Sequence, residues 1–236
     1  MVNALITGAS RGLGKQIALT LSARGYQVAV NYATSEKEAF DVAERAGGMS
    51  FALRADVGAA RQVKEMAIQI EKRFGRLDAV INNAGITKDN LLLRQSEDDW
   101  DRVINTNLKG CFNVMKVMAP LMKKSGGGHI LNISSYSGVK GKAGQAAYSA
   151  SKAALIGLSH TVARELAPYG IRVNVLLPGY MMTEMGTGAQ RAMEKAQEDS
   201  ISKDLSDPQE VAEFVAYLLG TTNITGQVFS LDSRII

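Results

Sequence analysis

A tyrosine and a lysine four residues apart, Tyr148 and Lys152, are the pair in this sequence whose chemistry is easiest to recognise. On a helix, side chains at positions i and i+4 lie on one face and can interact. A free tyrosine hydroxyl has a pKa near ~10, and a neighbouring positive charge favours its ionised form. We therefore predict that Tyr148 exchanges a proton with the oxygen of a carbonyl or an alcohol. The alternative is an exposed tyrosine beside an exposed lysine, because this spacing also occurs by chance in helices.

A glycine-rich turn stands between the first apolar segment and a helical pattern. Residues 3–7 are a predicted strand, the glycines that follow have the spacing G-x-x-x-G-x-G, and apolar residues recur at helical spacing from Ile17. Glycines allow a tight turn close to a ligand, and the free amides at the start of a helix attract an anion. We expect the pyrophosphate of a dinucleotide here, with a purely structural turn as the alternative. The candidate contacts are Gly8, Ser10, Arg11, Gly12, Leu13 and Gly14.

The end of the second predicted strand, residues 27–32, indicates which dinucleotide binds. An acidic residue at this point would accept a hydrogen bond from the ribose 2′-hydroxyl and select NAD. The chain has no acidic residue at this point. Glu36 comes too late and suits the first turn of a helix instead. Arg11, with Thr34 and Ser35 nearby, could instead meet a 2′-phosphate, so we expect NADP(H). The alternative for Arg11 is a loop charge in water.

Predicted strands and helices alternate along the chain, which has 236 residues, 46% of them hydrophobic and 21% charged. Segments that alternate at this spacing form parallel strands joined by right-handed helical crossovers, with helices on both faces of the sheet. A chain of this length can bury one large core. We therefore predict a single α/β domain over residues 1–236, with a helical pattern that resumes at Asn107 and runs to Lys124.

Several protein classes do not fit the composition. The apolar stretches are shorter than the roughly 18 residues needed to cross a bilayer, and the first residues resemble neither a signal nor a transit peptide, so we expect a cytoplasmic protein without a membrane partner. The net charge of +4 comes without a run of Lys and Arg, so nucleic acid is not an expected partner. Cys111 cannot form an internal disulfide and is expected to be buried. His129 and His160 lack companions at metal-ligand spacing, so we expect both to be structural and no metal to bind.

Small residues follow the predicted strand that ends at Ile81. Ligands of open parallel sheets bind at the carboxyl ends of the strands. Asn83, Ala84 and Gly85 stand at such an end, and we expect a cofactor to approach them closely.

The segment 180–206 has a different character from the rest of the chain. It carries four methionines among polar residues. Because methionine adapts to varied apolar shapes, the segment suits a mobile cover over a site. An ordinary pair of surface helices is the alternative.

Together these residues resemble the short-chain dehydrogenase/reductases, from Thr7 almost to the C-terminus. The resemblance implies a single Rossmann-type, doubly wound domain with a seven-stranded parallel sheet, usually assembled as a homotetramer. It also implies cofactor contacts from Asp56, Val57, Tyr148, Lys152, Pro178 and Gly179. The motifs that carry it, in the order of the family, are Thr7-Gly8-x3-Gly12-x-Gly14, Asn82-Asn83-Ala84-Gly85, Asn107, Ser135, Tyr148-x3-Lys152 and Pro178-Gly179.

The resemblance further assigns catalytic roles. Tyr148 would be the general acid in reduction, and Lys152 would favour its ionised form and bind the nicotinamide ribose. Ser135, which lies 13 residues before Tyr148 as in close family members, would bind the substrate carbonyl in preference to Ser134. Gln145 would contact the substrate. Asn107 would hold a water molecule that links Lys152 to solvent.

The runs 82–91 and 144–148 resemble the 3-oxoacyl-acyl-carrier-protein reductases of fatty acid synthesis. We therefore expect NADPH-dependent reduction of a 3-oxoacyl thioester on acyl carrier protein to the 3-hydroxyacyl thioester. Ser125 and Tyr169 replace arginines that often dock the carrier, and Arg234 follows Asp232 where the family usually has glycines. Two alternatives remain open: an acetoacetyl-CoA or broader carbonyl reductase, and a non-catalytic regulator that binds the cofactor.

Overall fold

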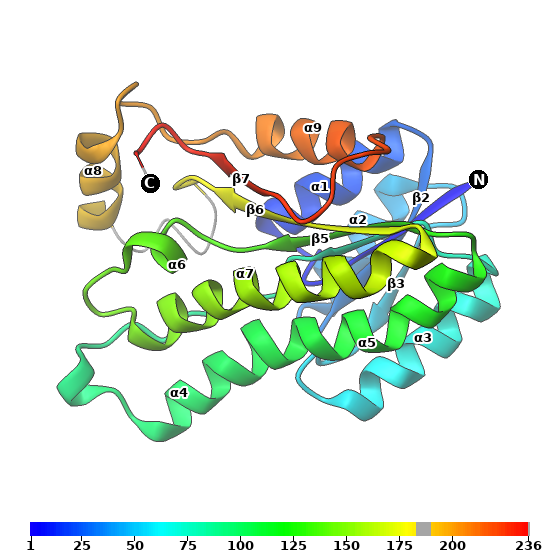
Figure 1. The fold of residues 1–236 in the computed structure, drawn as a ribbon, viewed down its shortest axis with the longest axis horizontal. Coiled ribbons are helices and arrows are strands. Elements are labelled where there is room, and N and C mark those ends of the chain that lie inside the picture. The colour runs from blue at the N-terminus through cyan, green and yellow to red at the C-terminus, as the bar shows by residue number, and fades with distance from the viewer. Residues whose placement is uncertain (183–189, 236) are drawn as a thin grey trace.

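The computed structural model describes residues 1–182 and 190–235. Within these residues the centre of the fold is a seven-stranded sheet in the order β3-β2-β1-β4-β5-β6-β7, and every pair of neighbouring strands is parallel (Figure 1). The prediction of one α/β domain around a seven-stranded parallel sheet is confirmed. The strands are β1 (Val2–Ile6), β2 (Tyr26–Tyr32), β3 (Phe51–Arg54), β4 (Ala79–Asn82), β5 (Gly128–Ile133), β6 (Ile171–Pro178) and β7 (Val228–Leu231).

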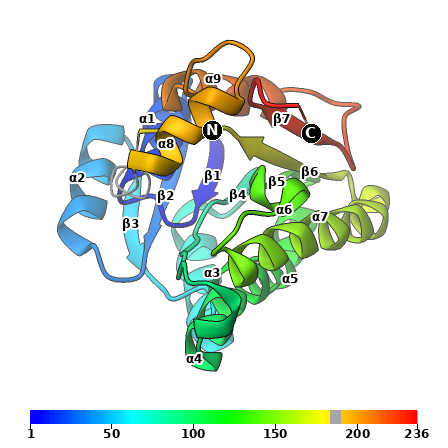
Figure 2. The same ribbon diagram turned by 90° about the vertical axis from the view of Figure 1, so that its left-hand side faces the viewer.

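Helices cover both faces of the sheet because successive side chains of a strand point to opposite sides. Ala4 and Ile6 of β1 join a buried cluster with α1, α2 and α9, whereas Leu5 joins a second cluster with α3, α5 and α7 (Figure 2). The fold is therefore doubly wound. The helices are α1 (Gly12–Ala23), α2 (Glu36–Ala46), α3 (Ala60–Phe74), α4 (Glu97–Ile104), α5 (Gly110–Lys124), α6 (Ser137–Lys140), α7 (Ala146–Leu166), α8 (Gln190–Asp199) and α9 (Pro208–Leu219). In the described part of the chain, no helix has both the length and the apolar character that crossing a bilayer requires.

The helical pattern at Asn107 differs in detail from the expectation. A π-helical segment, Asn105–Lys109, lies between α4 and α5. A π-turn holds one residue more than an α-turn, and such turns occur often at functional sites. Here the side chain of Asn107 is fully buried, accepts a hydrogen bond from the backbone N–H of Ile86 at 2.8 Å and donates one to its carbonyl at 2.9 Å. The wide turn thus ties the helices to the chain segment that follows β4.

His129, at the start of β5, is buried in a polar contact between strands. The amide of Asn174 has a fixed orientation, because its oxygen accepts from the N–H of Gln227 at 2.9 Å and its nitrogen donates to the carbonyl of Ile224 at 2.9 Å. That nitrogen lies 2.7 Å from Nε2 of His129, so Nε2 must accept and the imidazole is neutral. Burial, with a smaller contribution from the charge of Arg172, lowers the pKa of His129 to about 4. The structural role expected for this residue is consistent with these contacts.

We predict that acid removes part of the stability through His129. The unfolded chain takes up this proton at the ordinary pKa of 6.5 and the folded chain only near 4, so the free energy of unfolding falls as the pH drops through this window. The loss from this residue between pH 7 and 4.5 is roughly 2 to 3 kcal/mol. Urea denaturation of the parent, His129→Gln and the control His160→Gln at both pH values measures it. Equal pH dependence in all three proteins would contradict the assignment.

Candidate active site

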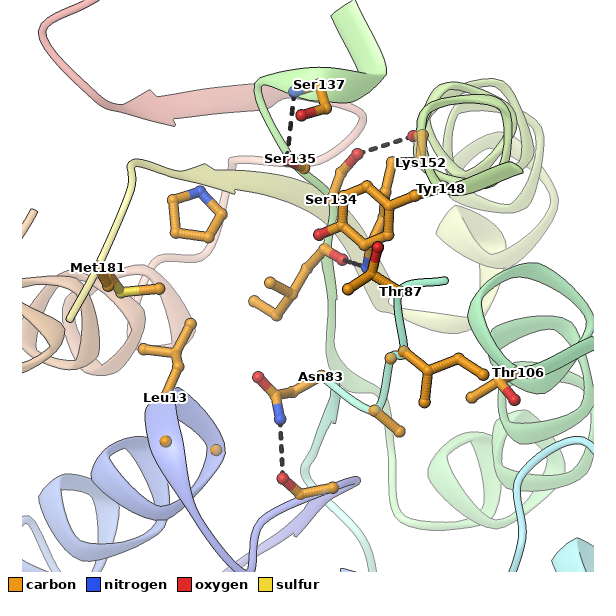
Figure 3. A pocket seen from close by; sticks show the side chains of 18 of the residues that line it. Leu13, Asn83, Thr87, Thr106, Ser134, Ser135, Ser137, Tyr148, Lys152 and Met181 are labelled. Carbon is orange, nitrogen blue, oxygen red and sulfur yellow. Dashed lines mark hydrogen bonds between the residues drawn. The ribbon is translucent and has the colours of Figure 1, made fainter. Parts of the chain in front are cut away.

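A cavity of about 1040 Å³ lies at the carboxyl edge of the sheet, bordered by the segments that follow β1 to β6 (Figure 3). Ligands of open α/β sheets bind at this edge. With the exception of Asn107, every residue that the sequence assigned to catalysis, cofactor or substrate borders this cavity. These residues are Gly8, Ser10, Arg11, Gly12, Leu13, Gly14, Asp56, Val57, Asn83, Ala84, Gly85, Ser135, Gln145, Tyr148, Lys152, Pro178 and Gly179.

The glycine turn has a shape that only glycine fits. Gly8 and Gly12 have φ angles of +61° and +55°, in the left-handed region that other residues avoid. A Cβ on Gly14 would lie 2.5 Å from the carbonyl oxygen of Gly8 and 2.5 Å from the amide nitrogen of Asn83. The turn therefore leads directly into α1 and leaves the N-terminal amides of that helix beside the cavity, which suits a pyrophosphate.

Hydrogen bonds between strand ends hold this turn in place. The hydroxyl oxygen of Thr7 accepts from the backbone N–H groups of Asn83 and Ala84, both at 3.0 Å. The side-chain amide of Asn83 donates to the carbonyl oxygens of Thr7 and Gly8, both at 3.0 Å. The backbone carbonyl of Asn31, a residue whose role the sequence did not indicate, accepts from the N–H of Ala9 at 2.9 Å. The ends of β1, β2 and β4 are therefore joined by hydrogen bonds.

The region beside the end of β2 contains the residues expected to select the cofactor. Arg11, Thr34 and Ser35 border the same cavity as the glycine turn. Asp56, after β3, also borders the cavity, and its carboxylate accepts from the N–H of Gly58 at 2.9 Å. The residues present fit a dinucleotide, and the lining at this point includes one basic side chain and two hydroxyl groups.

Lys152 connects α7 to the end of β5 through two groups, its side-chain ammonium and its backbone carbonyl. Its side chain is 4% exposed, and its ammonium donates to the carbonyl of Ile133 at 2.7 Å. Its own carbonyl accepts from the hydroxyl of Ser134 at 2.7 Å (Figure 3). The ammonium lies 5.7 Å from the ring centroid of Tyr148, one turn earlier on the helix. The predicted pairing of Tyr148 and Lys152 on one helix face is confirmed.

Ser135 is the serine whose hydroxyl is available to a ligand. The hydroxyl of Ser134 is occupied by Lys152, whereas the oxygen of Ser135 accepts from the N–H of Ser137 at 3.2 Å and keeps its own hydrogen for donation. Both hydroxyls are drawn in Figure 3 at the end of β5. The choice between the two serines, which rested on spacing, thus has a physical reason.

Gln145 borders the cavity and also connects two loops. Its side-chain nitrogen donates to the carboxylate of Asp89 at 2.8 Å, and its oxygen accepts from the hydroxyl of Ser137 at 2.9 Å. The N–H of Asn90 donates to the carbonyl of Gly144 at 2.8 Å. No local pattern in the sequence indicated Asp89 or its contact with Gln145.

The structure does not bring Asn107 to the cavity surface. Its side-chain amide contacts Ile86 and also donates to the hydroxyl of Ser151 at 3.1 Å. A Cβ on Gly85 would lie 3.4 Å from the Asn107 side-chain oxygen and 3.5 Å from the Lys152 ammonium, so both side chains face this glycine. The proton-supply role of Asn107 stays a prediction.

The expected cover, residues 180–206, is only partly described. Residues 183–189 lie outside the described residues. Met181 and, from α8, Lys195, Ala196 and Asp199 border the cavity. The position of these residues is compatible with a cover, whose movement stays a prediction.

The chemistry available in this cavity is proton donation next to a bound dinucleotide. Ser135 and Tyr148 supply hydroxyl groups, and Lys152 supplies a positive charge. Within residues 1–182 and 190–235, no group of three or more His, Cys, Asp or Glu side chains is arranged to hold a metal ion. Cys111 is buried, and burial raises its pKa to about 11, so it is not a nucleophile near neutral pH.

We predict that Gly14→Ala weakens dinucleotide binding at least tenfold. The new Cβ would overlap the Gly8 carbonyl and the Asn83 amide and so displace the turn. Fluorescence titration with NADPH and NADH gives the dissociation constants, and Gly157→Ala, where an added Cβ meets no atom within 4 Å, is the control. A Gly14→Ala protein that folds and binds as tightly as the parent would exclude this turn as the binding site.

Comparison with known proteins agrees with this geometry. A family model described as short chain dehydrogenase matches residues 2–195. The 3-oxoacyl-acyl-carrier-protein reductase FabG of Staphylococcus epidermidis is 44% identical to this chain over 236 residues, which cover 98% of this chain and 97% of the relative. The 3-oxoacyl-acyl-carrier-protein reductases of Synechocystis sp. and Thermotoga maritima are 42% and 39% identical, covering 99% and 98% of this chain and 96% of each relative. The chain belongs to the short chain dehydrogenase family and is an oxidoreductase that acts on a carbonyl or alcohol group with a nicotinamide cofactor.

Proposed function

We propose that this protein reduces a 3-oxoacyl thioester, carried by acyl carrier protein, to the 3-hydroxyacyl thioester in fatty acid synthesis, with NADPH as reductant. The observation that carries the proposal is that Ser135, Tyr148 and Lys152 border one cavity together with the glycine turn. The substrate class is supported by the similar proteins, which are 3-oxoacyl-acyl-carrier-protein reductases. Assembly as a homotetramer and location in the cytoplasm stay predictions.

Each of these side chains has a defined part in the proposed reaction. When bound, the nicotinamide supplies a hydride to the carbonyl carbon. Ser135 donates a hydrogen bond to the carbonyl oxygen, where negative charge grows, and Tyr148 donates the proton that this oxygen takes up. The ammonium of Lys152 stabilises the tyrosinate that is left. Asn107 keeps the segment after β4 in place beside Lys152.

The preference for NADPH is supported by the residues after β2. Thr34 and Ser35, which follow β2 and line the cavity, have neutral hydroxyl side chains. Arg11 lines the same cavity. A carboxylate there would repel a 2′-phosphate, whereas hydroxyls and a guanidinium can bind it.

The activity itself is tested with 3-oxobutanoyl-acyl carrier protein. We expect the parent to oxidise NADPH with this substrate and Tyr148→Phe to lower kcat at least 10²-fold, because the proton donor is lost while the ring remains. Tyr217→Phe, at an exposed position on α9, should retain the activity. Activity that survives in Tyr148→Phe would contradict the catalytic assignment, and a parent that reduces simple ketones but not the thioester would contradict the substrate class.

The residues at the expected carrier-docking positions favour a CoA-linked substrate as the second candidate. Ser125 and Tyr169 provide no positive charge, and the ammonium of Lys123 lies 4.0 Å from the ring centroid of Tyr169. Lys124 is paired with Glu71 at 2.7 Å. The cations Lys140 and Lys142 at the cavity could replace the absent arginines. The same assay with 3-oxobutanoyl-CoA decides between the two carriers through kcat/KM.

We predict that Arg11 discriminates between the two nicotinamide cofactors. Arg11→Ala should lower kcat/KM for NADPH about 10- to 100-fold, the range expected for losing hydrogen bonds to a charged group, and should change that for NADH less than threefold. Steady-state kinetics with both cofactors measure this. Arg61→Ala, on the exposed surface of α3, is the control. An equal loss with NADPH and NADH would mean that Arg11 does not contact the 2′-phosphate.

A further inference from the structure

The turn after β7 holds an ion pair that is largely shielded from water. The side chains of Asp232 and Arg234 are 6% and 13% exposed. The guanidinium of Arg234 donates from Nε to both carboxylate oxygens, at 3.0 and 2.8 Å, and from Nη2 to one of them. The backbone N–H of Arg234 donates to the same carboxylate at 3.0 Å. Such a planar, multiply bonded pair fixes the guanidinium in one orientation.

The fixed guanidinium packs on the ring of Tyr136. Its Cζ lies 4.0 Å from the ring centroid, which is a cation–π contact. The hydroxyl of Tyr136 donates to the carbonyl of Ile235 at 3.4 Å. Two contacts therefore connect Tyr136 to the turn after β7, which Figure 1 shows near α6.

The turn after β7 is itself anchored at several points. The hydroxyl of Ser233 lies 3.0 Å from that of Ser202 and accepts from the N–H of Ser202 at 3.3 Å. Asp232 packs against the loop after β6, since a Cβ on Gly179 would lie 3.2 Å from the Asp232 carboxyl carbon. The turn that packs on Tyr136 is thus held by contacts of its own.

Ser135 stands between two anchored neighbours. Ser134 is bonded to the carbonyl of Lys152 on α7, and Tyr136 is held by Arg234 on the opposite side. Anchors on both neighbours restrict the backbone of Ser135, and therefore the position of the Cβ from which its hydroxyl extends. A misplacement of about 1 Å at a reacting group can cost up to roughly 10²-fold in rate.

We propose that Arg234 is a positioning residue, which acts through Tyr136 to hold the hydroxyl of Ser135 at the substrate carbonyl. The inference rests on the proposed role of Ser135 in carbonyl reduction. Arg234 also borders the cavity, so direct binding of substrate is the alternative role. The two roles differ because a positioning residue loses its effect when the Ser135 hydroxyl is absent.

A double-mutant cycle separates these two roles. With 3-oxobutanoyl-CoA and NADPH, Arg234→Ala should lower kcat about tenfold and change the KM for NADPH less than twofold, and Tyr136→Leu should reproduce the loss. In a Ser135→Ala background, Arg234→Ala should change kcat less than twofold, because the hydroxyl that it positions is gone. Arg61→Ala is the control. An equal loss from Arg234→Ala in both backgrounds, or a rise in substrate KM alone, would overturn the proposal.

A measurement without substrate keeps the test independent of the proposed function. Amide hydrogen exchange of the ligand-free protein, read by mass spectrometry, should increase in Arg234→Ala for peptides that cover residues 134–140 and stay unchanged for those within α3. Unchanged exchange at residues 134–140 would overturn the proposal. If the parent fails to reduce the thioester while exchange increases as expected, the proposed function fails and the positioning contact stands.

Discussion

The two hydrogen bonds of Lys152 to consecutive residues of the β5 end are the contact on which the rest of the site depends. The ammonium holds the carbonyl of Ile133, and the backbone carbonyl holds the hydroxyl of Ser134. Tyr148 lies one helical turn before Lys152, and Ser135 follows Ser134 directly. One residue therefore links the two elements that carry the hydroxyl groups of Ser135 and Tyr148. Because these bonds are buried, breaking either one would leave an unpaired polar group and shift α7 relative to the sheet.

The parallel sheet brings the cofactor side of the cavity to the same edge. The strands alternate their side chains between two buried clusters, so their orientation and register are fixed by packing on both faces. Thr7 and Asn83 then join the ends of β1 and β4 through four hydrogen bonds at 3.0 Å. The glycine turn between Thr7 and α1 inherits this fixed position. Binding of a dinucleotide and proton donation thus share one scaffold.

The sequence predicts those parts of the structure that depend on local patterns. Alternating strands and helices predicted the α/β class, and the glycine turn and the Tyr148–Lys152 spacing were visible as residue types at fixed intervals. Long-range contacts were not visible. Nothing in the local sequence indicates that Asn31 supports the glycine turn, that Asp89 meets Gln145, or that Arg234 packs on Tyr136, 98 residues away. These pairs arise only when distant strands end at one edge. The contacts of Asn107 with Ile86 and Ser151 are also long-range and were not visible, and its role in proton supply stays a prediction.

The most direct test of the central claim is a crystal structure of the protein with NADP⁺ and a 3-hydroxyacyl thioester. The hydroxyl oxygens of Ser135 and Tyr148 should both lie about 2.6 to 3.2 Å from the oxygen on C3 of the ligand, the range of a proton-transfer contact. The ammonium of Lys152 should stay on the carbonyl of Ile133 or move to the ribose hydroxyls. A complex in which the C3 oxygen is bound by other groups, with Tyr148 directed away from it, would contradict the assigned chemistry.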